Sequence, residues 1–228
     1  MELAEIGRIH SCFDEKFGTP RQPGLAPATA AALVLAPPFD VPEMLRGLEG
    51  CSHVWLLFGF HLNVAKGWSP TVRPPRLGGN RRLGVFATRS PFRPNPVGLS
   101  AVTLEGILDD GTRRGLLLGN HDLVDGTPVY DVKPYVPYSD ALPAARPPSG
   151  FDQAPGRAPV CFSDAAERAL RQAPAELRRL IVDVLSLDPR PAYRRDEEGR
   201  MHGVTLAGHN VRWYARSGSF VVEEVWPG

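Results

Sequence analysis

Proline and glycine occur throughout the chain and limit the secondary structure that it can form. Among 228 residues there are 24 prolines and 23 glycines, about one residue in five. Helix interiors tolerate neither residue, so this composition argues against a helical bundle and favours short strands joined by turns. Apolar residues make up 43% of the chain, which is enough to bury a core. The length predicts one domain, or one domain with a small appendage.

The first part of the chain is predicted to be a small β-barrel. Residues 41–49 are expected to form one short helix, with Asp40 as its N-cap and Pro42 in its first turn. The strand-like segments are 3–10, 31–36, 53–61, 82–89, 97–108, 114–121 and 128–136. About seven short strands with one short helix predict a mostly β fold, a closed or half-closed barrel rather than a βαβ sheet.

The character of the sequence changes after residue 142. Residues 143–160 contain five prolines and no periodic apolar pattern, which is typical of a linker. Ser163 or Asp164 is a candidate cap for a single helix over 164–187, whose apolar residues recur at helical spacing. Three strands are predicted at 201–207, 210–216 and 219–226. The expected organisation is a barrel domain (1–142), a linker (143–160) and a small α+β domain (161–228).

Several classes of protein are disfavoured by what the sequence lacks. No basic segment followed by an apolar one begins the chain, and the longest apolar run, Val54–Phe58, is too short to cross a membrane. Cys12, Cys51 and Cys161 are odd in number and widely spaced, which indicates reduced thiols and neither a disulfide framework nor a zinc site. The expectation is a cytoplasmic protein without a metal. Rossmann, P-loop and nucleophile-elbow motifs are absent.

The charge is balanced overall but not locally. The formal net charge of +1 argues against a wholly basic protein, yet no acidic residue lies between Glu49 and Glu105. The basic residues of this window are Lys66, Arg73, Arg76, Arg81, Arg82, Arg89 and Arg93. Arginine suits bidentate phosphate contacts, and an exposed aromatic such as Trp68 could stack on an unpaired base. The window therefore indicates a nucleic-acid interface; the alternative is scattered, solvated arginines.

Three stretches have the composition of stiff loops or turns. Residues 84–98 (GVFATRSPFRPNPVG) hold three prolines within six residues and form either a binding loop or a rigid corner. Residues 124–137 begin with the turn signal Asp125-Gly126 and continue as a strand. Asp131 and Lys133 share one face of that strand, as a surface ion pair or as part of a pocket. Residues 20–24 (PRQPG) are a third, weaker candidate.

Together these stretches resemble the signature segments of the TrmO family, also called TsaA-like or YaeB-like. The segments are PRQPG (20–24), TVRPPRLGGN (71–80), GVFATRSPFRPNPVG (84–98) and LVDGTPVYDVKPY (123–135), in the family's order. DPRPAYR (188–194) resembles the C-terminal extension of the bacterial members. One departure is Tyr130, which stands where an aliphatic residue is common in the family.

The resemblance implies a specific activity. Members are S-adenosylmethionine-dependent methyltransferases of β-barrel fold that methylate N6 of N6-threonylcarbamoyladenosine at tRNA position 37, next to the anticodon. The implied cofactor is S-adenosylmethionine, held near a homodimer interface. The implied partners are a second copy of the chain and an anticodon stem-loop that carries threonylcarbamoyladenosine. Two alternatives stay open: a non-catalytic RNA-binding module, and a methyltransferase of this fold that acts on a small molecule.

The resemblance also suggests roles for residues. A carboxylate that accepts the N6 proton would help the transfer, and Asp125 and Asp131 are the candidates, with Lys133 orienting Asp131 or the carboxylate of the substrate. Each of them is alternatively an ion-pair or turn residue. The expected cofactor contacts are Arg21, Gln22, His61, Arg89, Ser90, Phe92, Asp125, Gly126 and Thr127. The expected tRNA contacts are Arg73, Arg76, Arg81, Arg82, Arg93, Arg190, Tyr193, Arg194, Arg195 and Arg212. A solvated cap is the alternative for the C-terminal residues.

Overall fold

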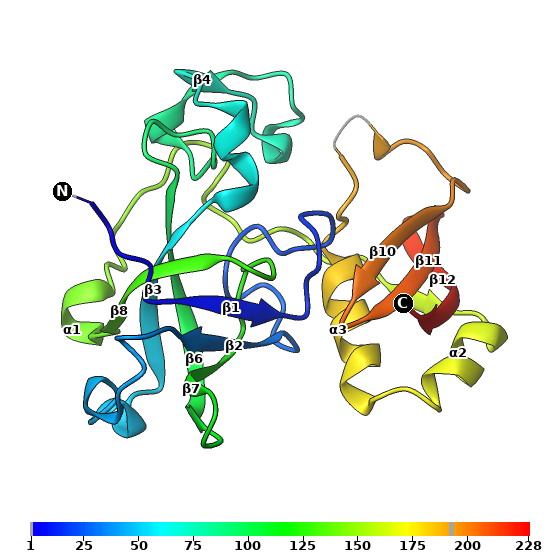
Figure 1. Cartoon of the computed structure of the whole chain (residues 1–228). Helices are drawn as coiled ribbons and strands as arrows, with labels where there is room; N and C mark the ends of the chain where they lie inside the picture. The colour runs from blue at the N-terminus through cyan, green and yellow to red at the C-terminus, as the bar shows by residue number, and fades with distance from the viewer. Residues whose placement is uncertain (1, 192–193) are drawn as a thin grey trace.

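Six antiparallel strands close a barrel in the first part of the chain. The computed structural model describes residues 2–191 and 194–228 (Figure 1). The barrel strands are β1 (Gly7–Ser11), β2 (Ala30–Leu35), β3 (His53–Gly59), β6 (Val97–Asp109), β7 (Arg114–Gly119) and β8 (Pro128–Pro134). Their order around the barrel is β1-β2-β7-β6-β3-β8. The prediction of a mostly β fold with a barrel is confirmed, and the barrel is a closed one.

The barrel interior follows the period-two geometry of its strands. Ile9, Leu33, Leu56 and Leu116 are fully buried, each from a different strand. Along β6 the buried positions alternate from Gly98 to Leu104. Gly98 is required there, because a Cβ atom would lie 2.3 Å from the ring of Phe58.

Two predicted elements of this first part are wrong. Of the predicted strand 82–89, only β5 (Leu83–Gly84) pairs, with β4 (Thr71–Val72), in a separate two-stranded sheet that stands above the barrel in Figure 1. The neighbouring prolines withhold the backbone donors that a longer pairing needs. The predicted helix 41–49 is instead two 3-10 turns, Pro42–Met44 and Leu48–Gly50, separated by Gly47 with φ of 93°. The N-cap position of the first turn is Val41 rather than Asp40.

Further short helical segments connect the strands. Three are 3-10 turns, at His61–Lys66, Pro75–Leu77 and Val85–Ala87, and one is an α-helix, α1 (Pro137–Asp140).

A second sheet with two helices forms the C-terminal part. Its elements are β9 (Val160–Phe162), α2 (Asp164–Leu170), α3 (Ala175–Ser186), β10 (His202–Leu206), β11 (His209–Arg216) and β12 (Ser219–Pro227). Ser163 caps α2 as predicted, its hydroxyl accepting from the Ala166 backbone N–H at 3.1 Å. The single predicted helix 164–187 is wrong, because Pro174 separates α2 from α3. β9, parallel to β12, was not predicted.

The two parts of the chain contact each other directly. Phe13, just after β1, is 1% exposed and belongs to the hydrophobic core of the C-terminal part. The backbone N–H of Ala207 donates to the carbonyl of Cys12 at 2.9 Å. Figure 1 shows the C-terminal sheet and helices beside the barrel, with the end of β1 directed toward them. The domain boundaries at 142 and 160 stay a prediction.

Candidate active site at one rim of the barrel

The segments that the sequence analysis proposed as binding loops lie together at one end of the barrel. The strand register aligns Ser11 with Ala31, Ala30 with Gly119, and Gly59 with Val97. The ends of β1, β3 and β7 therefore lie at the same end as the starts of β2 and β6. We call this end the rim and define it as residues 11–13, 20–30, 60–63, 88–100 and 119–127.

The PRQPG loop meets the segment 84–98, here called the arginine loop, at the rim. The guanidinium of Arg89 donates to the side-chain carbonyl of Gln22, from a position 67 residues away. The Gly24 N–H donates to the carbonyl of Asn120 at 3.2 Å, which fixes the loop to the segment after β7. Burial lowers the pKa of Arg21, the positive charge of Arg195 lowers it further, and Asp188 opposes both. Gln22 thus contacts Arg89, another predicted cofactor residue, whereas Arg21 lies within the electrostatic reach of the C-terminal part.

Asp122 and Ser100 are site residues that the sequence analysis missed. The hydroxyl of Ser100 donates to Asp122 at 2.7 Å. Burial raises the pKa of Asp122 to about 6, and the hydrogen bond from Ser100 and the nearby charge of Arg89 oppose the shift only in part. A signal was present in β6, where Ser100 is a polar residue in an otherwise inward-facing apolar row.

The Asp125–Thr127 turn is built by backbone contacts with β1. Ser11 N–H donates to the Asp125 carboxylate at 2.9 Å, and Gly126 N–H donates to the carbonyl of Ile9 at 2.8 Å. Gly126 has φ of 73°, and no atom lies within 4 Å of where its Cβ would be. Thr127 is buried and its hydroxyl donates to Val124. The carboxylate of Asp125 is therefore presented to solvent, while Thr127 holds the turn together.

His61 begins the 3-10 turn that follows β3. The preceding residue, Phe60, donates its N–H to the carbonyl of Pro96 at 2.8 Å, which joins the end of β3 to the arginine loop. Burial lowers the pKa of His61, the backbone of Gly59 opposes this shift, and weaker influences come from Arg8, Lys16 and Asp125. The imidazole is therefore neutral near pH 7 and lies within the electrostatic reach of Asp125.

The arginine loop is held by its own side chains. The hydroxyl of Ser90 accepts from the Phe92 N–H at 3.3 Å. Arg93 donates to the carbonyls of Thr88 at 2.7 Å and Val85 at 3.3 Å, so its guanidinium braces the loop. Arg89 is exposed, whereas Arg93 is half-buried.

Asp131 and Lys133 lie further along β8 than the turn. Their side chains form an ion pair at 2.6 Å, with 44% and 71% of the side chains exposed. The alternation that the sequence predicted does bring them together. Their exposure is typical of a surface pair, and their catalytic role stays a prediction.

Four of the predicted tRNA-contact arginines lie on the segment around β4 and β5. Arg73, Arg81 and Arg82 are exposed there, and the guanidinium of Arg76 lies 5.8 Å from the centre of the Phe151 ring. The exposed aromatic residues of the same segment are Trp68 and Phe86, which are 60% and 78% exposed.

The C-terminal arginines differ in how available they are. Arg190 is 5% exposed, pairs with Asp188 at 2.8 Å and lies over Phe220, so it organises the core of this part. Arg212 is exposed and pairs with Glu224 at 2.9 Å. Arg195 is exposed and Arg194 half-buried. Tyr193 lies outside the described residues.

Within the described ranges 2–191 and 194–228, no group of three or more His, Cys, Asp or Glu side chains is arranged to hold a metal ion. None of the helices described there has the length and apolar character that crossing a membrane requires. The three cysteines are free thiols.

The fold and the rim define a small β-barrel protein with a polar site at one end and a basic surface nearby. Residues 8–141 match the family model of the tRNA-methyltransferase O N-terminal domain, and residues 155–228 match that of the TrmO C-terminal domain. The chain belongs to the TrmO family, as its motifs indicated.

Relatives match along nearly the whole chain. An Escherichia coli K12 protein named tRNA (adenine(37)-N6)-methyltransferase is 45% identical, over 99% of this chain and 98% of its own. A Pseudomonas aeruginosa PAO1 protein named putative S-adenosylmethionine-dependent methyltransferase RcsF is 51% identical, over 93% of this chain and 91% of its own. The crystal structure of TrmO from Pseudomonas aeruginosa superimposes with a TM-score of 0.82 at 43% identity, covering 99% of this chain and 98% of that one.

Proposed function

We propose that this protein transfers a methyl group from S-adenosylmethionine to N6 of adenine 37 in tRNA, and that the adenine carries the threonylcarbamoyl group. The contact of Gln22 with Arg89, at the rim that also carries the exposed carboxylate of Asp125, is the observation that carries the proposal. The names of the relatives from Escherichia coli and Pseudomonas aeruginosa support the same reaction and the same cofactor.

The rim has the groups that such a cofactor requires. S-adenosylmethionine carries a carboxylate, an ammonium and a sulfonium, and arginine is well suited to a carboxylate. Arg89 has an exposed guanidinium, and Asp125 offers an exposed carboxylate for an ammonium or hydroxyl donor. The side-chain oxygen of Asn120 is buried without a hydrogen-bond partner, which leaves an acceptor unused in the described structure. Gly126 leaves open space where the backbone can approach a ligand.

The remaining predicted cofactor contacts complete this proposed site. Arg21, Gln22 and His61 would line it from the PRQPG loop and the end of β3. Ser90, Phe92 and Thr127 would do so from the arginine loop and the turn. An aromatic face such as that of Phe92 suits a sulfonium cation better than a guanidinium does.

The chain's own residues would align the nucleophile and remove its proton. The bound cofactor supplies an electrophilic methyl group. N6 of the adenine is a weak nucleophile because its lone pair is delocalised, so a nearby base assists the transfer. We propose that Asp125 accepts the N6 proton, with its carboxylate oriented by the N–H of Ser11. Asp131, with Lys133 as its partner or as a contact for the threonyl carboxylate, is the second candidate. Positioning supplies much of the remaining acceleration.

The tRNA would bind over the basic segment beside the rim. Arg73, Arg76, Arg81 and Arg82 would contact phosphates, and Arg93 is included in the proposal although its guanidinium also braces the loop. In the C-terminal part, the proposed contacts are Arg190, Tyr193, Arg194, Arg195 and Arg212. The burial of Arg190 makes it the weakest candidate among them.

We further propose that the protein acts as a cytoplasmic homodimer. Large apolar side chains are exposed near the rim, with Leu99 55% exposed and Val64 60% exposed, and a second copy would cover them. Light scattering at micromolar concentration would give a mass near twice 24.9 kDa if the proposal holds. A monomer at that concentration would contradict the proposed dimer.

The substrate proposal is tested with two tRNAs that differ only in the threonylcarbamoyl group. Labelled S-adenosylmethionine and purified enzyme should yield methylated threonylcarbamoyladenosine, measured by nucleoside mass spectrometry, and no product from the tRNA that lacks the group. Equal methylation of both would contradict the finer substrate assignment. Failure to bind the cofactor in calorimetry would favour an RNA-binding module instead.

The cofactor site itself is tested with Arg89→Ala. Loss of a charge-assisted contact should reduce kcat/KM at least about tenfold. Arg113→Ala removes an exposed arginine of the β6–β7 turn and is the matched control. Wild-type turnover of Arg89→Ala would remove this residue from the site.

A further inference from the structure

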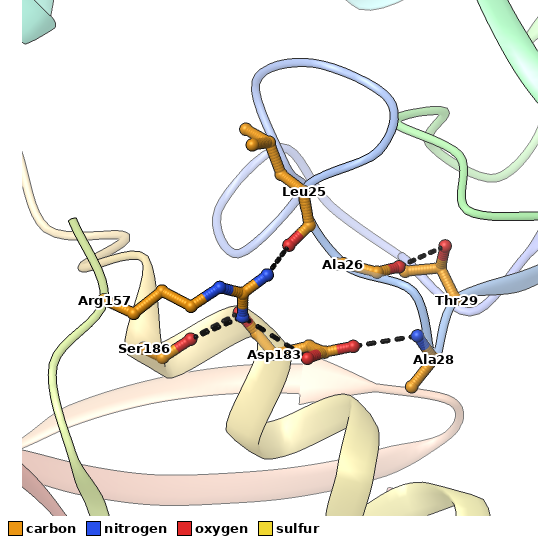
Figure 2. A network of polar contacts seen from close by, with 7 residues as sticks. All are labelled: Leu25, Ala26, Ala28, Thr29, Arg157, Asp183 and Ser186. Atoms are coloured by element: carbon orange, nitrogen blue, oxygen red, sulfur yellow. Dashed lines mark hydrogen bonds and ion pairs between the residues drawn. The ribbon is translucent and has the colours of Figure 1, made fainter. Parts of the chain in front are cut away.

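The PRQPG loop (20–24) and the residues that follow it, as far as Ala28, are held by residues from outside the barrel. Figure 2 shows Arg157, from the segment before β9, and Asp183, from α3, facing the loop. The guanidinium of Arg157 donates to the carbonyl of Leu25, and the N–H of Ala28 donates to the carboxylate of Asp183 at 2.8 Å. Leu25 comes three residues after Gln22, so these contacts lie close to the proposed cofactor residue.

Arg157 and Asp183 are also fixed relative to one another. One nitrogen of Arg157 lies 3.4 Å from Asp183 and 3.1 Å from the hydroxyl of Ser186. The carbonyl of Ser186 accepts from the N–H of Ala158 at 2.9 Å. The side chain of Asp183 is only 18% exposed. A charge pair braced in this way keeps its geometry better than an isolated surface pair does.

The opposite side of the loop is fixed to the barrel. Thr29 is 3% exposed, and its hydroxyl donates to the carbonyl of Ala26 and accepts from the N–H of His121, both at 2.9 Å. The N–H of Asn120 donates to the carbonyl of Thr29 at 3.2 Å. The loop is therefore held on both sides, by residues of the C-terminal part and by the residues directly before Asp122.

We propose that Asp183 and Arg157 are positioning residues through which the C-terminal part fixes the loop that presents Gln22 to Arg89. The inference rests on the proposed function, because it assigns the loop to the cofactor. Residues 20–28 have no regular secondary structure, so without the clamp they would sample more conformations. The conformational entropy lost when these residues become ordered would then weaken cofactor binding. The C-terminal part would serve the cofactor as well as the tRNA.

The test compares three variants of the full chain. Asp183→Ala removes the acceptor of Ala28 and the partner of Arg157, and Asp183→Asn keeps one oxygen but loses the charge. Arg178→Ala is the matched control, because Arg178 is on the same helix and pairs with Glu167 at 2.5 Å, away from the loop. The measurements are the Kd for S-adenosylmethionine, the KM for tRNA, and amide hydrogen exchange of residues 20–29.

The expected pattern separates positioning from simple stabilisation. Asp183→Ala should weaken cofactor binding about tenfold and speed exchange in the loop, with Asp183→Asn intermediate and Arg178→Ala unchanged. The KM for tRNA should stay near the wild-type value. A lower melting temperature with unchanged cofactor Kd and unchanged loop exchange would overturn the inference.

The design also separates this inference from the proposed function. If wild-type protein fails to bind S-adenosylmethionine, the proposed function fails. If wild type binds and Asp183→Ala binds equally well, only the inference fails. Should Asp183→Ala not fold, Arg157→Ala removes the contact with Leu25 and is judged by the same measurements.

Discussion

At the scale of single residues, the rim contains two carboxylates in opposite environments. Asp125 is exposed, with a backbone N–H as its partner, whereas Asp122 is half-buried and accepts from Ser100. An exposed carboxylate can reach a substrate, whereas a half-buried one held by a neighbouring hydroxyl can orient the groups around it. The two residues are three positions apart, yet they should respond differently to the same substitution.

Asp125→Asn should remove the proton acceptor and leave the turn intact. The amide oxygen can still accept from Ser11, so stability should change little, while kcat falls about a hundredfold. Asp131→Asn provides the comparison, because that residue belongs to the other candidate pair. Single-turnover methylation rates with both variants check the expectation. A larger loss in Asp131→Asn would transfer the proposed base to that residue.

Asp122→Asn should change how stability depends on pH. The pKa of Asp122 is raised to about 6 in the folded protein, from 3.8. The folded state therefore holds the proton more tightly, and stability falls as pH rises from about 4 to about 6. Above that window the partly buried charge destabilises the wild type by about 3 kcal/mol. The variant lacks this charge and keeps an acceptor for Ser100.

Urea unfolding at pH 4, 5 and 7 measures the effect. Stability of the variant relative to wild type should rise between pH 4 and pH 6 and then stay constant. The neighbouring His121, whose pKa burial lowers to about 4, makes both proteins less stable as pH falls below its usual value. Subtracting the two curves removes that shared contribution. A stability difference that does not change with pH would contradict the raised pKa of Asp122.

At the scale of elements, loops connect the strands at the rim, and their own side chains determine their shape. The strands themselves were predictable, because alternation along β6 and the apolar run of β3 reflect burial directly. The segment 82–89 was not, since its strand-like residues compete with nearby prolines that withhold backbone donors. Pro174 also interrupts a helix, although the apolar residues over 164–187 recur at helical spacing on both sides of it. Asp122 was missed because its importance depends on Ser100, which lies 22 residues earlier.

Arg93→Ala should loosen the arginine loop. The carbonyl of Thr88 loses the Arg93 donor, and the carbonyl of Val85 keeps only the N–H and hydroxyl of Thr88, so the loop should exchange its amide hydrogens faster. The Kd for S-adenosylmethionine should rise about fivefold or more. Arg82→Ala, in which an exposed arginine contacts only the Thr71 hydroxyl among the contacts described, is the comparison. An effect of Arg93→Ala confined to the KM for tRNA would instead favour the predicted phosphate contact.

At the scale of the whole molecule, the near-neutral net charge conceals an uneven distribution. The exposed arginines around β4 and β5 lie in a stretch without a single acidic residue. Such a surface attracts a polyanion through release of its counterions, which makes binding dependent on salt. The net charge could not predict this basic surface, whereas the positions of the charged residues in the sequence did.

Removing Arg73, Arg81 and Arg82 one at a time should weaken tRNA binding similarly for every tRNA. Each removal should also reduce the slope of log Kd against log salt by about one, as expected for one phosphate contact. Fluorescence anisotropy from 50 to 300 mM KCl, about the range in which such slopes are measured, checks this. Arg113→Ala should leave the slope unchanged. An unchanged slope in all three variants would contradict tRNA binding at this surface.

Phe13 has a consequence for how this protein can be divided. Its ring belongs to the apolar core of the C-terminal part, although the chain supplies it from the end of a barrel strand. A fragment cut after residue 142 would expose that ring to water and remove Ala207, the donor to Cys12. The barrel is thus not a transferable module. Grafting it, or shortening the chain to it, would require a polar residue in place of Phe13 or another surface to cover it.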